Sequence, residues 1–197
     1  MPMVTKSQKL VFVTHNKHKI SEVSAIAGTD IVVSGLADFN FYDEIPETTG
    51  TFEGNALQKA RYFYERFHCD CFADDTGLEV NALDGRPGVY SARYAGEHAT
   101  YSENVEKLLK EMKGVTDRRA RFVTVVALIL NGKEYLFEGE VKGEIIVEPR
   151  GTSGFGYDPV FKPDFSPLTF AELGEEEKNL YSHRGNALRK MINFLKS

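Results

Sequence analysis

Apolar and polar residues along the chain alternate between short apolar runs and amphipathic segments, a pattern typical of strands and helices that follow one another. The first apolar run, residues 10–13, predicts a buried strand, and the spacing of Ile20, Val23, Ile26 and Ala27 predicts a helix directly after it. The same helical periodicity recurs in three later segments: residues 56–67, residues 103–112, and a helix that opens at 181–185 and continues to 195. This alternation predicts an α/β fold.

The clearest turn signal is Asn131-Gly132, which separates two long segments with a strand pattern, residues 121–131 and residues 134–147. An Asn-Gly pair favours the tight turn of a hairpin, so we predict a long β-hairpin that serves as scaffold. A shorter strand is expected at residues 77–80, followed by a turn at residues 84–88.

An apolar or small segment, residues 69–77, carries two adjacent carboxylates, Asp74 and Asp75, followed by Thr76 and Gly77. We expect the carboxylates at the end of a strand, because a strand usually presents charge at its end rather than in its middle. Neighbouring carboxylates resist ionisation unless a cation neutralises them, so the pair is a candidate site for Mg²⁺ or a lysine. The alternative is an ordinary turn in which the side chains bond the local backbone.

The segment between the first strand and the first helix is a candidate anion site. In an open α/β sheet such a turn lies at the carboxyl edge, where the following helix offers unpaired N–H groups. The segment places basic and titratable residues at the N-terminus of the helix, where the helix dipole disfavours cations. A bound phosphate would explain why they are there. Alternatively, Asn16 is only an N-cap beside a solvated first turn. The residues of this segment are Thr14, His15, Asn16, Lys17, His18 and Lys19.

Two later segments carry further candidate chemistry. Residues 149–159 combine glycines with Phe155, Tyr157 and Asp158, which predicts a defined backbone with exposed rings. This segment is either a flexible glycine loop or a loop in which a planar ligand stacks on Phe155. At the start of the last helix, His183 and Arg184 again place cationic donors at a helix N-terminus.

Composition narrows the class of protein. The chain has 197 residues, of which 42% are apolar and 27% charged, as expected for one globular domain. A formal charge of -5 argues against a general nucleic-acid binder. The two cysteines, Cys69 and Cys71, are expected to be buried thiols that cannot easily bridge one another. Residues 1–9 lack a signal-peptide core, and the longest apolar run is too short for a membrane span, so we expect a cytoplasmic protein.

Taken together, the motifs resemble those of one family, the inosine/xanthosine triphosphate pyrophosphatases. The matching stretches occur in the family's order and cover nearly the whole chain. They are residues 12–19, Glu47-Thr48 with Thr51-Phe52 and Asn55-Ala56, residues 73–78, residues 87–94, residues 154–159, residues 171–173, Glu177-Lys178, and residues 182–185.

The resemblance implies an elongated, mixed α/β fold with a twisted sheet, flanking helices and two lobes around a central cleft, within a single domain of residues 1–197. It also implies a homodimer that requires Mg²⁺. Such an enzyme would convert a purine nucleoside triphosphate, such as ITP, dITP or XTP, to the monophosphate and pyrophosphate.

Roles for particular residues follow from the same resemblance. Asp75 would be the proton acceptor and a metal ligand, with Glu47 as the loop carboxylate at the metal and Asp74 in support. Residues 14–19 would line the triphosphate, with Asn16 and Lys19 in direct contact. The remaining substrate-binding positions would be Thr76, Phe155, Gly156, Tyr157, Asp158, Lys178, His183 and Arg184.

The chain departs from the family pattern at a few positions. The family usually has glycine where His15 stands, so either the backbone needs no positive φ there or His15 adds a side chain near the phosphates. Gly54 replaces a usual glutamate, and Thr76 replaces a serine but keeps the hydroxyl. Two other functions remain open: a pyrophosphatase for other modified nucleotides, and a nucleotide-binding module without turnover.

Overall fold

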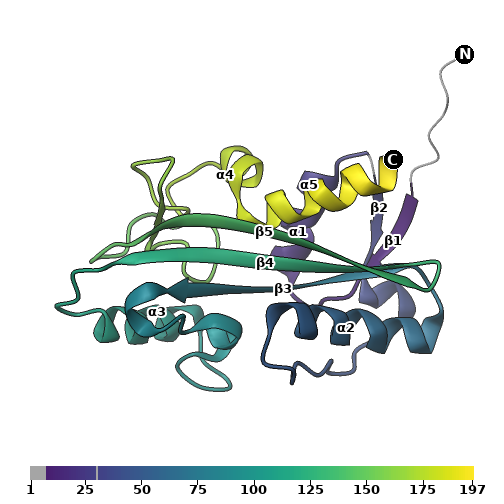
Figure 1. Ribbon diagram of the computed structural model, residues 1–197, viewed down its shortest axis with the longest axis horizontal. Coiled ribbons are helices and arrows are strands. Elements are labelled where there is room, and N and C mark those ends of the chain that lie inside the picture. The colour runs from purple at the N-terminus through teal and green to yellow at the C-terminus, as the bar shows by residue number, and fades with distance from the viewer. Residues whose placement is uncertain (1–7, 30) are drawn as a thin grey trace, which may run out of the picture. The chain divides into compact units, whose positions relative to one another are not determined.

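A computed structural model describes residues 8–29 and 31–197 (Figure 1). A six-stranded sheet runs in the order β2-β1-β3-β4-β5-β6. β1 pairs with β2 and with β3 in parallel, whereas β5 and β6 are antiparallel, so the sheet is mixed. The strands are β1 (Gln8–Phe12), β2 (Ile31–Ser34), β3 (Cys71–Val80), β4 (Arg119–Leu130), β5 (Lys133–Ile145) and β6 (Phe161–Pro163).

The α-helices are α1 (Lys17–Ala27), α2 (Phe52–Phe67), α3 (Tyr101–Glu111), α4 (Glu175–Tyr181) and α5 (His183–Lys196), with short 3₁₀ turns at Leu36–Phe39, Asn81–Leu83 and Gly88–Arg93. Among the described residues, four of the five α-helices lie where the periodicity predicts them, and α4 was not predicted. Within residues 8–29 and 31–197, no helix is both long and apolar enough to cross a membrane. The expectation about residues 1–9 falls almost entirely outside the described part of the chain.

The chain divides into two compact units whose boundaries fall inside β3, β4, β5 and α5. The first unit comprises the described residues of Met1–Asp75, Val125–Glu138 and Ala187–Ser197. The second comprises Thr76–Thr124 and Gly139–Asn186.

The first unit has a core between its strands and two helices. Side chains of α1 and α5 pack on the strands, and the buried members of this core are Leu10, Phe12, Val23, Ala27, Ile31, Phe72, Val126, Leu128, Ala187, Leu188, Met191 and Ile192. α2 lies across the strands from α5 (Figure 1). Its Phe63 and Phe67 pack against Phe39 and Phe41, which fixes the loop before α2 to the helix.

The second unit has its own core, built around aromatic rings. Phe122 of β4 packs edge-on against Phe161 and stacks with Phe170, with ring centroids 4.7 and 5.9 Å apart. Val105 and Leu108 of α3 belong to the same buried cluster. This core supports the loop of residues 149–159.

The predicted scaffold is confirmed, with one error in β3. Asn131 and Gly132 have φ of 50° and 75° and join β4 to β5, as the hairpin prediction requires. Asp74 and Asp75, however, lie in the middle of β3 rather than at its end. The interior of a strand tolerates these charges here because amino and amide groups from other segments face each carboxylate.

The two cysteines differ from one another. Cys71 is buried in β3, whereas Cys69 precedes the strand and is only partly buried. Both thiols are free.

Candidate active site

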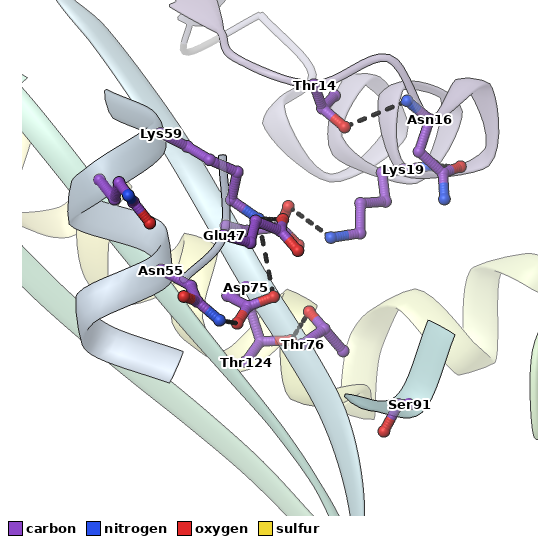
Figure 2. A network of polar contacts seen from close by, with 12 residues as sticks. Thr14, Asn16, Lys19, Glu47, Asn55, Lys59, Asp75, Thr76, Ser91 and Thr124 are labelled. Carbon is purple, nitrogen blue, oxygen red and sulfur yellow. Dashed lines mark hydrogen bonds and ion pairs between the residues drawn. The ribbon is translucent and has the colours of Figure 1, made fainter. Parts of the chain in front are cut away.

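The first unit holds three carboxylates that pair with two lysines, and we call these carboxylates the carboxylate cluster: Glu47, Asp74 and Asp75. Asp75 lies between two side chains of α2, Asn55 and Lys59 (Figure 2). Asn55 Nδ2 donates to Asp75 Oδ2 at 3.0 Å, and Lys59 Nζ is 3.6 Å from Asp75 Oδ1. The same lysine pairs with Glu47 in the loop before α2. Lys59 therefore bridges two of the three carboxylates.

Asp74 is held by a different helix. Lys19 of α1 donates from Nζ to Asp74 Oδ1 at 2.9 Å, and the Asp74 side chain is only 2% exposed. A buried charge of this kind is tolerated only when it is paired, and Lys19 supplies that partner and holds the Asp74 side chain in place.

Burial and charge act in opposite directions on this cluster. Burial raises the pKa of Asp75, and the positive charges of Lys59 and Lys19 oppose that shift without cancelling it. Burial lowers the pKa of Lys59, but attraction to Asp75, Glu47 and Asp74 outweighs burial and leaves the pKa above its ordinary value. A carboxylate with a raised pKa, next to a firmly charged ammonium, suits a proton acceptor at a site for anionic substrates.

The carboxylate cluster is the predicted metal site. Among residues 8–29 and 31–197, no three His, Cys, Asp or Glu side chains gather closely enough to ligate one ion. Two of the predicted ligands, Glu47 and Asp75, nevertheless share one positive charge, that of Lys59. Carboxylate oxygens are the donors that Mg²⁺ prefers, so the donor set fits a divalent cation. The role of Asp74 at such an ion stays a prediction.

The predicted phosphate-binding segment is shaped by its own side chains. Asn16 Oδ1 accepts hydrogen bonds from His18 N and Lys19 N at 3.0 and 3.2 Å, so Asn16 is the N-cap of α1. Thr14 Oγ1 accepts from Asn16 N at 3.1 Å, as Figure 2 shows. Lys17 and His18 are exposed in the first turn of α1. Contact of this segment with phosphate remains a prediction.

His15 has an ordinary backbone and a ring turned toward another loop. Among the described residues, the non-glycine residues with positive φ are Asn40, His68, Asp84 and Asn131, so position 15 does not require glycine. The His15 ring stacks on Phe41, and its Nε2 bonds Asp43 O at 3.0 Å.

In the second unit, two cationic side chains, Lys178 and Arg184, lie beside the ring of Phe155. Together with Asp158, which pairs with Lys178, these residues form what we call the Phe155 cluster. Lys178 Nζ and the Arg184 guanidinium lie 5.2 and 5.8 Å from the centre of the Phe155 ring. Asp158 Oδ2 accepts from Lys178 Nζ at 2.7 Å and from Phe155 N at 2.9 Å. Asp158 thus fixes both the loop backbone and the lysine.

Arg184 is buried, with 1% of its surface exposed, and donates to Thr76 Oγ1 at 3.2 Å. Thr76 in turn shares a hydrogen bond with Thr124 at 2.7 Å. The Thr76 hydroxyl therefore takes part in two hydrogen bonds, one with Arg184 and one with Thr124. Beside Arg184, the His183 ring stacks on Phe122 at a centroid distance of 4.6 Å. Both residues at the start of α5 are thus fixed by packing.

One predicted feature of the glycine-rich loop is wrong. Tyr157 does not expose its ring but buries it in the core of the second unit, where its hydroxyl donates to Ser91 O at 2.9 Å. The loop therefore presents Phe155 and uses Tyr157 as an anchor. Gly156 has a φ of 63°, which lets the chain reverse between the two rings.

Two residues that contact the carboxylate cluster, Asn55 and Lys59, are not among the predicted site residues. Lys59 is buried, with 7% of its surface exposed. Asn55 matched a family motif but received no role. The two are four residues apart and share a helix face with Ala56 and Ala60, and this spacing was the available signal.

Comparison with known proteins places these features in context. The sequence profile of the Ham1 family matches residues 10–194. The dITP/XTP pyrophosphatase of Flavobacterium johnsoniae is 51% identical over 95% of this chain and 97% of its own. That of Porphyromonas gingivalis is 49% identical over 95% of this chain and 97% of its own.

Solved structures agree with the sequence comparison. The Ham1 protein of Staphylococcus aureus has a TM-score of 0.87 at 39% identity, covering 96% of this chain and 98% of its own. A nucleoside-triphosphatase, described as a dITP/XTP pyrophosphatase, from Mycobacterium abscessus has a TM-score of 0.76 at 41% identity, covering 93% of this chain and 98% of its own.

Proposed function

Because this chain belongs to the Ham1 family, we propose that it is a nucleoside triphosphate pyrophosphatase that acts on non-canonical purine nucleotides such as dITP, ITP and XTP. The products would be the nucleoside monophosphate and pyrophosphate, and the reaction would keep such nucleotides out of nucleic acids. The observation that carries this proposal is the full-length similarity to proteins named dITP/XTP pyrophosphatase, joined to a buried carboxylate cluster with two lysines.

In the proposed reaction, a water molecule attacks the phosphorus atom that bears the pyrophosphate leaving group. A new P–O bond forms, the bond to pyrophosphate breaks with its electron pair, and Asp75 accepts the proton of the water. Asn55 Nδ2 donates a hydrogen bond to the Asp75 carboxylate and holds it in orientation for this proton transfer. Lys19 and Lys59 offset the negative charge of the triphosphate.

We assign Mg²⁺ to Glu47 and Asp75, with Asp74 in support. When bound, the ion would neutralise charge on the phosphate oxygens and lower the barrier to departure of pyrophosphate. The site would then hold two positive charges, that of the Mg²⁺ ion and that of the Lys59 ammonium group. Support for the assignment is the oxygen donor set described above.

The purine base is assigned to residues of the second unit. The Phe155 ring offers a face for stacking, and Arg184 offers N–H donors of the kind that a 6-oxo group accepts. An adenine would bring its own N6 donor to such a group and leave a buried donor unpaired, which can be worth on the order of 10⁴-fold in specificity. This accounts for a preference for 6-oxo purines.

We further propose that the enzyme is a cytoplasmic homodimer. The two free thiols fit a reducing compartment, and the dimer follows from the family resemblance. Light scattering after size-exclusion chromatography tests the dimer, since a mass near that of one chain would contradict it.

Steady-state kinetics on a panel of nucleotides tests the substrate class. We expect kcat/KM for ITP, dITP and XTP to exceed that for ATP by about 10²-fold or more. The panel includes dUTP and a methylated pyrimidine triphosphate. A higher kcat/KM for either of these would replace the purine assignment with the alternative of a pyrophosphatase for other modified nucleotides.

A further inference from the structure

His15 connects the segment at the start of α1 to the loop that carries Glu47. Its ring lies parallel to that of Phe41, with centroids 6.2 Å apart and 4° between the planes. Since Asp43 O can only accept, His15 Nε2 is the donor of the 3.0 Å hydrogen bond between them. One side chain thus holds both the ring and the backbone of this loop.

α2 holds the same part of the loop from another direction. The Arg66 guanidinium lies 5.4 Å from the centre of the Phe41 ring and bonds Asp43 Oδ2 at 2.7 Å. Phe41 is 2% exposed, so its ring is a firm anchor. His15 and Arg66 therefore fix residues 41–43 together.

The loop is anchored again immediately after Glu47. Thr48 N donates to Gln58 Oε1 at 2.9 Å, and Thr49 N donates to Asn55 Oδ1 at 3.1 Å. Only residues 44–46 separate the first anchor from Glu47. The position of its carboxylate therefore depends on both anchors, and His15 belongs to the first of them.

We propose that His15 is a positioning residue that links the predicted phosphate-binding segment to Glu47 and holds this carboxylate in the carboxylate cluster. The proposal rests on the proposed function for its catalytic consequence, although the loop order that it describes does not. The backbone at position 15 needs no positive φ, so the side chain of His15 is free to support the loop.

Hydrogen exchange in the nucleotide-free protein tests the positioning directly. His15→Ala is expected to speed exchange of the amides of Phe41, Thr48 and Thr49, each of which donates a hydrogen bond, and to leave β3 and β4 unchanged. His98→Ala removes an exposed histidine elsewhere and is the matched control. Unchanged exchange of residues 41–49 in His15→Ala would overturn the proposal.

A double-mutant cycle on kcat/KM tests the catalytic consequence. His15→Ala should lower kcat about three- to tenfold with KM for the nucleotide nearly unchanged, the effect expected from losing one hydrogen bond. In a Glu47→Gln background, the same substitution should cause no further loss, because its effect passes through Glu47. An equal loss in both backgrounds, or a loss confined to KM, would mean direct phosphate contact and would refute the positioning role.

The two experiments separate the inference from the proposed function. If the unaltered enzyme hydrolyses none of the nucleotides, the proposed function fails, whereas the exchange result still decides whether His15 orders the Glu47 loop.

Discussion

At the scale of single residues, the chemistry depends on how Asp75 is kept ionised while buried. Burial disfavours its charge, and Lys59 and Lys19 restore part of the loss. Removing the charge while keeping the shape is therefore the most informative substitution, because Asn can still contact Asn55 and Lys59.

Asp75→Asn should lower kcat by about 10²- to 10⁴-fold, the range that a general base contributes. The nucleotide should still bind, as measured by calorimetry, because the lysines remain. Asp117→Asn, at an exposed aspartate paired only locally with Arg119, is the control and should retain full activity. Near-normal turnover in Asp75→Asn would remove Asp75 from its role. If the unaltered protein binds nucleotides but hydrolyses none of them, the alternative of a binding module is favoured instead.

The same substitution should raise the stability of the nucleotide-free protein. The pKa of Asp75 is higher in the folded protein than the ordinary value of 3.8, so its contribution favours folding below that value and is lost as pH rises through the folded pKa. At pH 7 the charged form costs stability, and asparagine avoids this cost. Thermal melts should show a higher Tm for Asp75→Asn at pH 7 and a smaller difference toward pH 4, whereas a lower Tm at pH 7 would contradict the pKa assignment.

At the scale of elements, the glycine-rich loop works because Gly154 leaves room for Asp158. Gly154 has a φ of 77°, and a Cβ at this position would overlap the Asp158 carboxylate. That carboxylate holds Lys178 and the Phe155 backbone.

Gly154→Ala should therefore raise KM by about tenfold or more, because the Phe155 cluster must rearrange, and the positive φ should cost about 1 kcal/mol of stability. Gly114→Ala is the matched control, since Gly114 has a φ of 76° and open space around its Cβ position. It should lose similar stability without a change in KM. If both variants keep the KM of the unaltered enzyme, the loop does not position the base.

The elements also show what the sequence could predict. Local signals were sufficient for the hairpin at Asn131-Gly132 and for the start of α1, since turn chemistry and capping depend on neighbouring residues. Local signals could not predict that Asp74 and Asp75 lie in the middle of a strand. Those charges are compensated by Lys19 and Lys59, which lie 55 and 16 positions away in the chain, and such compensation exists only in the folded protein.

The candidate site was predicted unevenly for the same reason. Thr76 and Lys178 were identified from motifs, and the structure gives each a defined partner in the second unit. The burial of Lys59 and Tyr157 could not be read from the chain, because each is an amphipathic residue whose exposure depends on distant partners. The contact of His15 with Phe41 and Asp43 likewise joins segments that no local pattern connects.

At the scale of the whole molecule, each compact unit supplies one part of the proposed chemistry. The first unit holds carboxylates and lysines suited to phosphates, and the second holds a ring and buried donors suited to a base. The chain joins the two sets within β3, where Asp75 and Thr76 are consecutive. The central claim is therefore that one enzyme removes pyrophosphate from a 6-oxo purine nucleotide.

The most direct measurement of this claim is phosphate release from ITP and XTP with Mg²⁺, with and without added inorganic pyrophosphatase. We predict a signal only when the added enzyme is present, because the product is pyrophosphate. Free phosphate released without the added enzyme, or no turnover of either nucleotide, would contradict the claim.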